Sequence, residues 1–276
     1  MPTLPPSILT VLQPFSILFF TSKTWGHAML LLTGTLMCRG GRTVCSALKI
    51  LGMKGENGFD KYHKILNRAK WSSHDGSKIL LEQLLDPEEE TLLIAVDEHL
   101  ERRRGKNIKA KGYYRDAVRS TKKCVVKCSG LKWITVMVLK KFPWHSRVFA
   151  LPFMTILAAS KRANQEIGKK HKTTIDWTIQ LVKQLRRWLP KRRIILSTDG
   201  GFANAAFGWV NICQKTHLVS RLRQDARLFD FPGKQSGPGR RAKKGKRLMT
   251  PKEMFKQEGL DWKEQKVSWY GGQKKI

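Results

Sequence analysis

The sequence predicts a mixed α/β fold, in which a mixed β-sheet is flanked by helices and follows a small all-helical N-terminal region. Residues 40–85 show apolar side chains at helical spacing. After residue 89 short apolar runs typical of strands come first, and helix and strand patterns then alternate. That order suits a mixed sheet covered by helices. Asp86, Pro87 and the acidic run that follows mark the boundary between the two regions.

We therefore divide the chain into a helical region 1–88, a sheet-containing core 89–230 and a basic C-terminal stretch 231–276. Within the core, Thr173 with Asp176 fits a capping box at the start of an amphipathic helix. The expected strands are 92–96, 124–126, 133–139, one within 147–159, 194–196 and 217–221, and the expected helices are 79–85, 172–189 and 203–213.

The helical region contains two short helices joined by a glycine-rich turn, the second over about 59–69. Lys61, Lys64 and Arg68 lie largely away from the apolar side of this second helix. A basic second helix after a turn is typical of a helix-turn-helix DNA reader. An ordinary helical hairpin with a solvated basic face fits equally well, so both interpretations stay open.

The first 38 residues are apolar and carry one charge, Lys23. A signal peptide would start with a basic segment, which this sequence lacks. The apolar run 8–20 is interrupted by Pro14 and is too short to span a bilayer. We expect buried helices, or a segment that leads into the fold, with a membrane hairpin as the less favoured alternative.

The chain has 53 Lys and Arg against 21 Asp and Glu, and the resulting net charge of +32 indicates a polyanionic partner. Nucleic acid is the leading candidate because phosphate neutralisation releases counterions, and an anionic membrane surface is the runner-up. A basic protein of the ribosomal kind is less favoured, because such proteins are usually shorter and poorer in Trp than a chain with nine Trp. No transmembrane segment or small-molecule cofactor motif is expected.

The five cysteines show no regular spacing, which argues against a disulfide framework and fits a reducing cytoplasm. Cys124 and Cys128 have the spacing of half a zinc site. No second pair with ligand spacing follows, so buried thiols are the favoured interpretation.

Two carboxylates share one local setting, since Asp97 and Asp199 each follow a short apolar strand. Strand ends on adjacent strands can place both side chains around one site. Carboxylate oxygens are the ligands that Mg²⁺ and Mn²⁺ prefer, and a pair of such ions supports phosphodiester chemistry. The alternative is that each Asp only ends a strand and starts a turn. His99 and His145 are expected to be structural.

Cations gather directly after Asp97 and again in the glycine- and lysine-rich stretch 233–247. Basic side chains beside a metal-binding acid make sense when the substrate is a polyanion. The basic run after Asp97 extends to Lys109 and Lys111. The candidate DNA-binding residues, besides Lys61, Lys64 and Arg68, are Arg102, Arg103, Arg104, Lys106, Arg115, Lys243 and Lys244.

With these motifs in order, the sequence resembles bacterial insertion-sequence transposases of the DDE superfamily, whose core has the ribonuclease H-like fold. The resemblance covers most of residues 40–230. It rests on Ala95–Ile108 with Gly112–Ala117, on His171–Thr173 with Trp177 and Arg187–Pro190, on Ile195–Phe202, and in the helical region on Gly41–Val44, Tyr62–His63 and Leu66–Trp71.

The resemblance implies that Asp97 and Asp199 are the first two catalytic acids, holding two Mg²⁺ or Mn²⁺ ions. The third acid in this family is a Glu on a late helix, in a Tyr-x-x-Arg-Trp-x-x-Glu-like setting after a β-rich insertion. Glu253, Glu258 and Glu264 lack that setting, so the role is carried onto none of them. We therefore expect a truncated gene product, with the third acid beyond residue 276 and little strand transfer by the fragment alone.

The implied activity is metal-dependent phosphodiester hydrolysis and strand transfer at insertion-sequence ends. The implied partners are double-stranded DNA of the element ends and of the target, with no membrane, and a homodimer is left open. The expected location is the bacterial cytoplasm, in association with the nucleoid. The alternative function is a non-catalytic, basic DNA-binding remnant, which needs the N-terminal helices but not the two aspartates.

Overall fold

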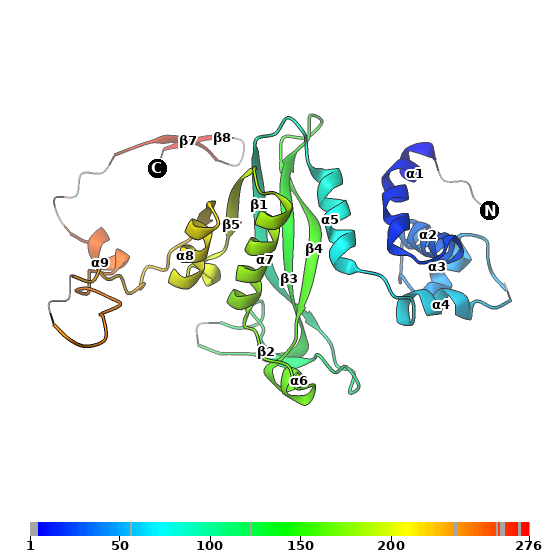
Figure 1. Cartoon of the computed structure of the whole chain (residues 1–276), viewed down its shortest axis with the longest axis horizontal. Helices are drawn as coiled ribbons and strands as arrows, with labels where there is room; N and C mark the ends of the chain where they lie inside the picture. Colours follow the sequence, from blue (N-terminus) through cyan, green and yellow to red (C-terminus); the bar gives the residue numbers. More distant parts are fainter. Residues whose placement is uncertain are drawn as a thin grey trace. The chain divides into compact units, whose positions relative to one another are not determined.

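The chain forms two compact units, Met1–Asp86 and Pro87–Ile276, which are described separately. Helices alone make up the first unit, and the second contains a mixed sheet with flanking helices (Figure 1). The computed structural model describes residues 5–55, 57–121, 123–233, 237–257, 259, 263–269 and 272–275.

The first unit is a small helical assembly built around α2 and α3. The buried side chains Leu31, Ala47, Leu48 and Tyr62 form the centre of its core. Gly34 of α2 lies so close to α3 that an added methyl group would overlap the carbonyl oxygen of Ala47. The helices are α1 (Pro6–Leu12), the 3-10 helix η1 (Gln13–Leu18), α2 (Ser22–Met37), α3 (Val44–Ile50), α4 (Asp60–Asn67) and α5 (Ser73–Leu84).

Helices form in the apolar N-terminal segment, but the expectation that they are buried is wrong for most of their residues. No residue of α1 is buried, and Ile17 and Phe20 are 79% and 99% exposed. The core of this unit is small, and the residues of α2 that are buried in it are Leu31, Thr33 and Gly34. In the part of the chain that the structure describes, no helix has the length and apolarity needed to cross a membrane.

Both helices of the expected pair are present, and Thr43 caps α3 by accepting a hydrogen bond from the Ser46 amide. The connection from α3 to α4 covers residues 51–59, which is longer than the three- to four-residue turn of a helix-turn-helix. Its glycines adopt positive φ, as Gly52 does at 76°. DNA reading by α4 therefore stays a prediction. Helix α5 begins six residues before the expected helix, because Ser72 caps it.

The main sheet of the second unit is mixed, which confirms the expected α/β fold class. Strands β1, β2 and β4 each pair antiparallel with β3, whereas β5 pairs parallel with β1, and β6 pairs parallel with β5. This arrangement is consistent with the ribonuclease H-like fold. The order is β2-β3-β1-β5-β6, with β4 also on β3, for β1 (Thr91–Arg102), β2 (Gly112–Arg115), β3 (Lys127–Lys141), β4 (Val148–Ala158), β5 (Arg193–Thr198) and β6 (Thr216–Ser220).

One face of the sheet carries the core, and α7 (Thr174–Trp188) packs against it. The capping box at Thr173 and Asp176 is present as expected. Alternate residues of the central strands, such as Ile94, Val136 and Leu196, are fully buried on this face. The remaining elements are α6 (Lys161–Glu166), the 3-10 helix η2 (Gly200–Phe202), α8 (Ala205–Cys213), α9 (Pro251–Phe255), β7 (Lys266–Trp269) and β8 (Gly272–Lys275).

The expected strand at 124–126 is wrong, and the strand expected at 133–139 is longer, running from 127 to 141. The backbone groups of 124–126 bond to the preceding loop instead. The Asp116 amide donates to the Val126 carbonyl, and the Ser120 hydroxyl contacts both polar groups of Val126. The Cys124 thiol is exposed, which contradicts its expected burial.

Asp116 holds the end of β2 to the end of β1. Its buried carboxylate pairs with Arg102 at 2.7 Å and accepts hydrogen bonds from the backbone amides of Val118 and Arg119. The Arg102 hydrogen bond is the main cause that lowers the pKa of Asp116 from 3.8 to about 2. Arg102, a candidate DNA contact, is therefore engaged in holding the fold.

Replacing Asp116 by Asn is expected to destabilise the protein at neutral pH, because the amide loses the ion pair. A carboxyl whose pKa is lower in the folded state stabilises the protein above its unfolded pKa near 3.8. That contribution is lost as pH falls through about 2. The unfolding midpoint in urea should therefore differ between wild type and Asp116→Asn at pH 7, and the difference should shrink between pH 4 and 2. A constant difference would contradict this account.

Gly34→Ala is expected to destabilise the first unit by about 1–3 kcal/mol, because the new methyl group overlaps the backbone of Ala47. Gly26 lies on the same helix with no atom near its missing side chain, so Gly26→Ala is the matched control. That control should be neutral or stabilising by up to about 1 kcal/mol, through helix propensity alone. Urea unfolding of the full chain, followed by circular dichroism, measures both. Equal effects would refute the close packing.

Candidate active site

Asp97 and Asp199 are brought together by the parallel pairing of β1 with β5. The last residue pair is Val96 of β1 opposite Thr198 of β5, and Asp97 and Asp199 are the residues that directly follow this pair. Asp199 keeps an extended backbone, with φ −73° and ψ 173°, so the two main chains still run side by side. Adjacent strands are about 4.8 Å apart, so the two carboxylates are near neighbours.

Both carboxylates lie on the sheet face opposite to α7. Side chains alternate between the two faces along a strand, and Val96 and Thr198 are buried in the core. Glu98 marks the α7 face directly, because its carboxylate accepts a hydrogen bond of 2.7 Å from the Thr174 hydroxyl of α7. Asp97 and Asp199 therefore point to the other face, and both are exposed.

The sequence placed Asp97 at the end of a strand, and this detail is wrong. Strand β1 continues to Arg102, and Asp97 pairs with Thr135 of β3. The pairing with β5 is what ends at this point. Asp97 is thus fixed on its β3 side by the antiparallel ladder, while its β5 side opens towards Asp199. The backbone at Asp97 is therefore held within the sheet, at the point where the pairing of β1 with β5 ends.

Asp199 is anchored by the turn that follows it. One carboxylate oxygen accepts from the Gly201 amide at 3.0 Å, and the backbone oxygen accepts from the Ser220 hydroxyl at 2.7 Å. Within the described chain the second carboxylate oxygen has no hydrogen-bond donor. A side chain at Gly200 would come within 2.8 Å of the Arg221 carbonyl oxygen, so the turn needs glycine there.

Arg221 is a site residue that the sequence analysis missed. Strand β6 pairs in parallel with β5 as far as Ser220 opposite Thr198, so Arg221 occupies the position next to Asp199. By strand alternation it lies on the same face as the two aspartates, and it is exposed. Its position directly after the third parallel strand was the available signal. A cation there can bind phosphate beside the acid pair.

Glu101 and two of the late glutamates are engaged in other contacts. Glu101 accepts from the Trp133 indole at 2.9 Å and pairs with Arg103, and these contacts lower its pKa. Glu253 caps α9, and Glu264 pairs with Lys275, while Glu258 lies outside the described residues. Among the residues that the structure describes, no group of three or more His, Cys, Asp or Glu side chains is placed to hold a metal ion.

The donor chemistry of Asp97 and Asp199 fits a hard divalent cation. Both offer carboxylate oxygens, both are exposed, and they lie side by side on adjacent strands. Mg²⁺ is bound in proteins through one or two carboxylates and keeps several waters. Two carboxylates alone leave much of the coordination shell to water and to substrate oxygens.

The candidate DNA-binding cations fall into two groups. Several are held within the protein: Arg102 by Asp116, Arg103 by Glu101 and Lys64 by Asp60 at 2.5 Å. The rest are set against rings or exposed to solvent: Lys61 over the Tyr62 ring, Lys244 over the Phe229 ring, and Arg68, Arg104, Lys106, Arg115 and Lys243 exposed.

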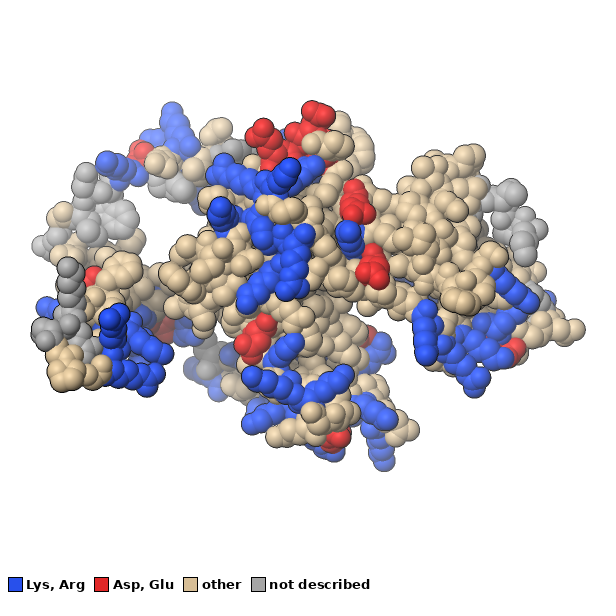
Figure 2. All heavy atoms as spheres, viewed as in Figure 1, with Lys and Arg blue, Asp and Glu red and all other residues tan. Residues whose placement is uncertain are grey.

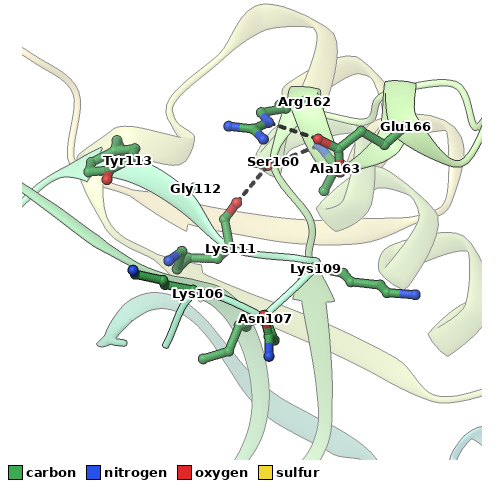
Figure 3. A pocket seen from close by; sticks show the side chains of 11 residues that line it. Lys106, Asn107, Lys109, Lys111, Gly112, Tyr113, Ser160, Arg162, Ala163 and Glu166 are labelled. Carbon is green, nitrogen blue, oxygen red and sulfur yellow. Dashed lines mark hydrogen bonds and ion pairs between the residues drawn. The ribbon is translucent and has the colours of Figure 1, made fainter. Parts of the chain in front are cut away.

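Lys and Arg side chains cover much of the molecular surface in one view (Figure 2). In the second unit they gather over α7 and over the end that carries β2 and α6, where few acidic side chains interrupt them. Lys106 belongs to the latter group and lines a cavity there (Figure 3). Surfaces of this kind attract polyanions.

Comparison with known proteins gives one family match. The model of a family described as DDE superfamily endonuclease matches residues 15–276. No curated protein matches the chain. Among solved structures it is similar to the piggyBac transposase in a synaptic complex with hairpin DNA, at 10% identity and a TM-score of 0.37. That alignment covers 79% of this chain and 48% of the other, so this chain spans about half the length of that protein.

The family match includes both strand ends that carry the aspartates, together with the sheet that aligns them. The resemblance seen in the sequence motifs points to the same superfamily. The chain belongs to the DDE superfamily endonuclease family.

Proposed function

We propose that this protein is a DNA transposase of the kind that hydrolyses phosphodiester bonds and transfers strands at the ends of an insertion sequence, with little strand transfer by this chain alone. The observation that carries the proposal is the placement of Asp97 and Asp199. Each lies one residue beyond the parallel pairing of β1 and β5, on the same exposed sheet face. Membership of the DDE superfamily endonuclease family supports the same chemistry.

In this proposal Asp97 and Asp199 hold Mg²⁺ or Mn²⁺. When bound, a divalent cation supplies a lowered pKa of its water and charge stabilisation at phosphoryl oxygens. The chain itself contributes rigid placement, since Asp97 is fixed by the β3 ladder and Asp199 by the Gly201 amide. Arg221, next to Asp199, would bind a phosphate of the DNA at the point of reaction.

The exposed cations would hold the remainder of the DNA. Arg104 and Lys106 lie in the loop after β1, and Arg115 ends β2, while in the first unit Lys61 and Lys64 belong to α4 and Arg68 follows it. Such contacts fix the position of a duplex without reading its sequence. Lys243 and Lys244 extend the cationic surface at the C-terminal side. We infer double-stranded DNA of element ends and target as the substrate, handled in the bacterial nucleoid.

A second candidate function is DNA binding without chemistry, favoured by the formal charge of +32. Electrostatic contacts alone supply most non-specific DNA affinity. The two functions differ in what they require. Chemistry needs Asp97 and Asp199, whereas binding needs only the cations, and removing one carboxylate leaves the cations in place.

Replacing Asp97 or Asp199 by Asn should lower Mn²⁺ uptake, because each change removes an anionic ligand. Electron paramagnetic resonance of free Mn²⁺ measures the uptake directly. Any Mn²⁺-dependent nicking of plasmid DNA should fall about 100-fold or more, since metal-bound oxygens contribute several kcal/mol to the transition state. Affinity for DNA measured in EDTA should be unchanged.

The matched control for these variants is Glu98→Gln, which removes one charge from the neighbouring residue on the α7 face. It should leave Mn²⁺ uptake as in wild type. The proposed metal role is wrong if Asp97→Asn, Asp199→Asn and Glu98→Gln all take up Mn²⁺ like the wild type. DNA binding that persists in such a case would favour the non-catalytic function.

Arg221→Gln should weaken duplex binding and reduce the slope of log affinity against log salt by about 0.9, the value for one lost phosphate contact. Arg221→Lys should keep most of that slope, because the charge is kept. Arg193→Gln, at the opposite end of the same parallel strands, is the control for a lost surface cation. Fluorescence anisotropy over a range of salt concentrations tests this, and equal slopes for Arg221→Gln and Arg193→Gln would remove Arg221 from the site.

A further inference from the structure

A cavity of about 530 Å³ lies at the corner where the chain leaves β1, enters β2 and later forms α6 (Figure 3). We name it the corner pocket. Its volume is in the range of pockets that bind small ligands or parts of larger ones. It is lined by Lys106, Asn107, Ile108, Lys109, Lys111, Gly112, Tyr113, Ser160, Arg162, Ala163 and Glu166.

Ser160 holds the walls of the corner pocket in place. Its hydroxyl donates to the Lys111 carbonyl at 3.0 Å and accepts from the Ala163 amide at 3.2 Å. A side chain at Gly112 would come within 2.7 Å of the Ser160 β-carbon, so glycine permits this contact. The Lys111 amino group donates to the Gly105 carbonyl at 2.8 Å and fixes the loop. The pocket is thus shaped by the protein before any ligand binds.

The charge of the corner pocket is positive. Lys106, Lys109, Lys111 and Arg162 line it, against the single acid Glu166. Glu166 is paired with Arg162 at 2.8 Å, as Figure 3 shows. Lys106 and Lys109 are exposed and form no ion pair among the described residues. Two cations are therefore available to an anionic ligand such as phosphate.

Tyr113 provides the second feature that points to a ligand. It lies on the edge strand β2, and 77% of its side chain is exposed. It lines both the corner pocket and a neighbouring cavity of about 370 Å³, which Lys132, Lys161 and Lys172 also line. In the second cavity Lys132 pairs with Glu98 and Lys172 donates to Gln180, whereas Lys161 is exposed. Tyr113 thus borders two cavities that each have an exposed lysine, an arrangement that matches consecutive phosphates with a base between them. Aromatic rings stack on unpaired bases of any sequence.

We propose that the corner pocket binds single-stranded DNA, with one phosphate held by Lys106, a neighbouring phosphate held by Lys109 and an unpaired base stacked on Tyr113. The inference deepens the proposed function and rests on it for the choice of DNA. A duplex would use the cations alone, because its bases are paired and stacked on one another. The exposed ring therefore favours an unpaired strand.

The place of the pocket relative to the acid pair fits this role. Arg102 is the fifth residue of β1 after Asp97, which corresponds to roughly 17 Å along the strand. Gly130 of β3 pairs with both Arg102 and Gly112, so the pocket begins at the end of that path. An unpaired strand held there would lie a few nucleotides from the proposed reaction centre.

The test is fluorescence anisotropy with a labelled oligothymidylate and a labelled duplex, in EDTA so that no metal contributes. Tyr113→Ala should weaken single-strand binding about 5- to 100-fold and leave duplex binding unchanged. Tyr113→Phe should bind like wild type, because the ring is kept. Lys106→Gln with Lys109→Gln should reduce the salt slope for the single strand by about 1.4, the value for two lost contacts.

Lys183→Gln with Lys191→Gln removes the same charge from exposed positions on and after α7, and it should change the single-strand slope less. The proposal is overturned by any of three results: no single-strand binding by the wild type, equal binding by Tyr113→Ala, or equal losses in the two double variants. Competition by polyglutamate as effective as the oligonucleotide at equal charge would also overturn it, in favour of an acidic peptide.

These results are separable from a failure of the proposed function. Asp97→Asn keeps every residue of the corner pocket, so single-strand binding should persist in it. Conversely, Tyr113→Ala keeps both aspartates and should take up Mn²⁺ like the wild type. Loss of strand binding with intact Asp97-dependent uptake would remove only the pocket inference.

Discussion

The parallel pairing of β1 with β5 is the constraint on which the site depends. Its register is set by apolar residues that alternate along both strands, with Ile94 and Leu196 buried in the core. A slip of one residue would turn Asp97 towards α7 and expose apolar side chains, which burial strongly disfavours. The energy that aligns the carboxylates therefore comes from the core beneath them and not from the carboxylates themselves.

Local signals in the sequence were sufficient for part of this structure. The capping box at Thr173, the helix that follows it and the junction between β5 and Asp199 depend on neighbouring residues, and they were predicted. The length of β1 was not, because Asp97 to Arg102 are polar or charged apart from Leu100 and show no apolar alternation. Their extended conformation comes from pairing with β3, a contact between segments distant in sequence. Arg221 was missed for the same reason, since its place depends on β6 joining β5.

The basic residues illustrate a second limit of the sequence. Arg186 is half-buried and donates to the carbonyls of Gln214, Lys215 and Arg192, so its guanidinium ties the end of α7 to the start of two strands. Burial lowers its pKa. Arg102 likewise stabilises the fold, through its ion pair with Asp116. A composition of 53 Lys and Arg cannot separate such residues from those that face solvent, and only the folded chain makes the distinction.

The exposed acid pair lies midway along β1 and the corner pocket lies beyond the end of β1, and the two carry opposite charges. Two carboxylates side by side, such as Asp97 and Asp199, repel each other, and Arg221 occupies the position next to Asp199. A bound divalent cation would relieve that repulsion and would in turn attract phosphate oxygens. The cations around the corner pocket act on the same polyanion farther along β1. A single DNA strand that reaches both sites would therefore meet cations at the pocket and, through a bound divalent cation, positive charge at the acid pair.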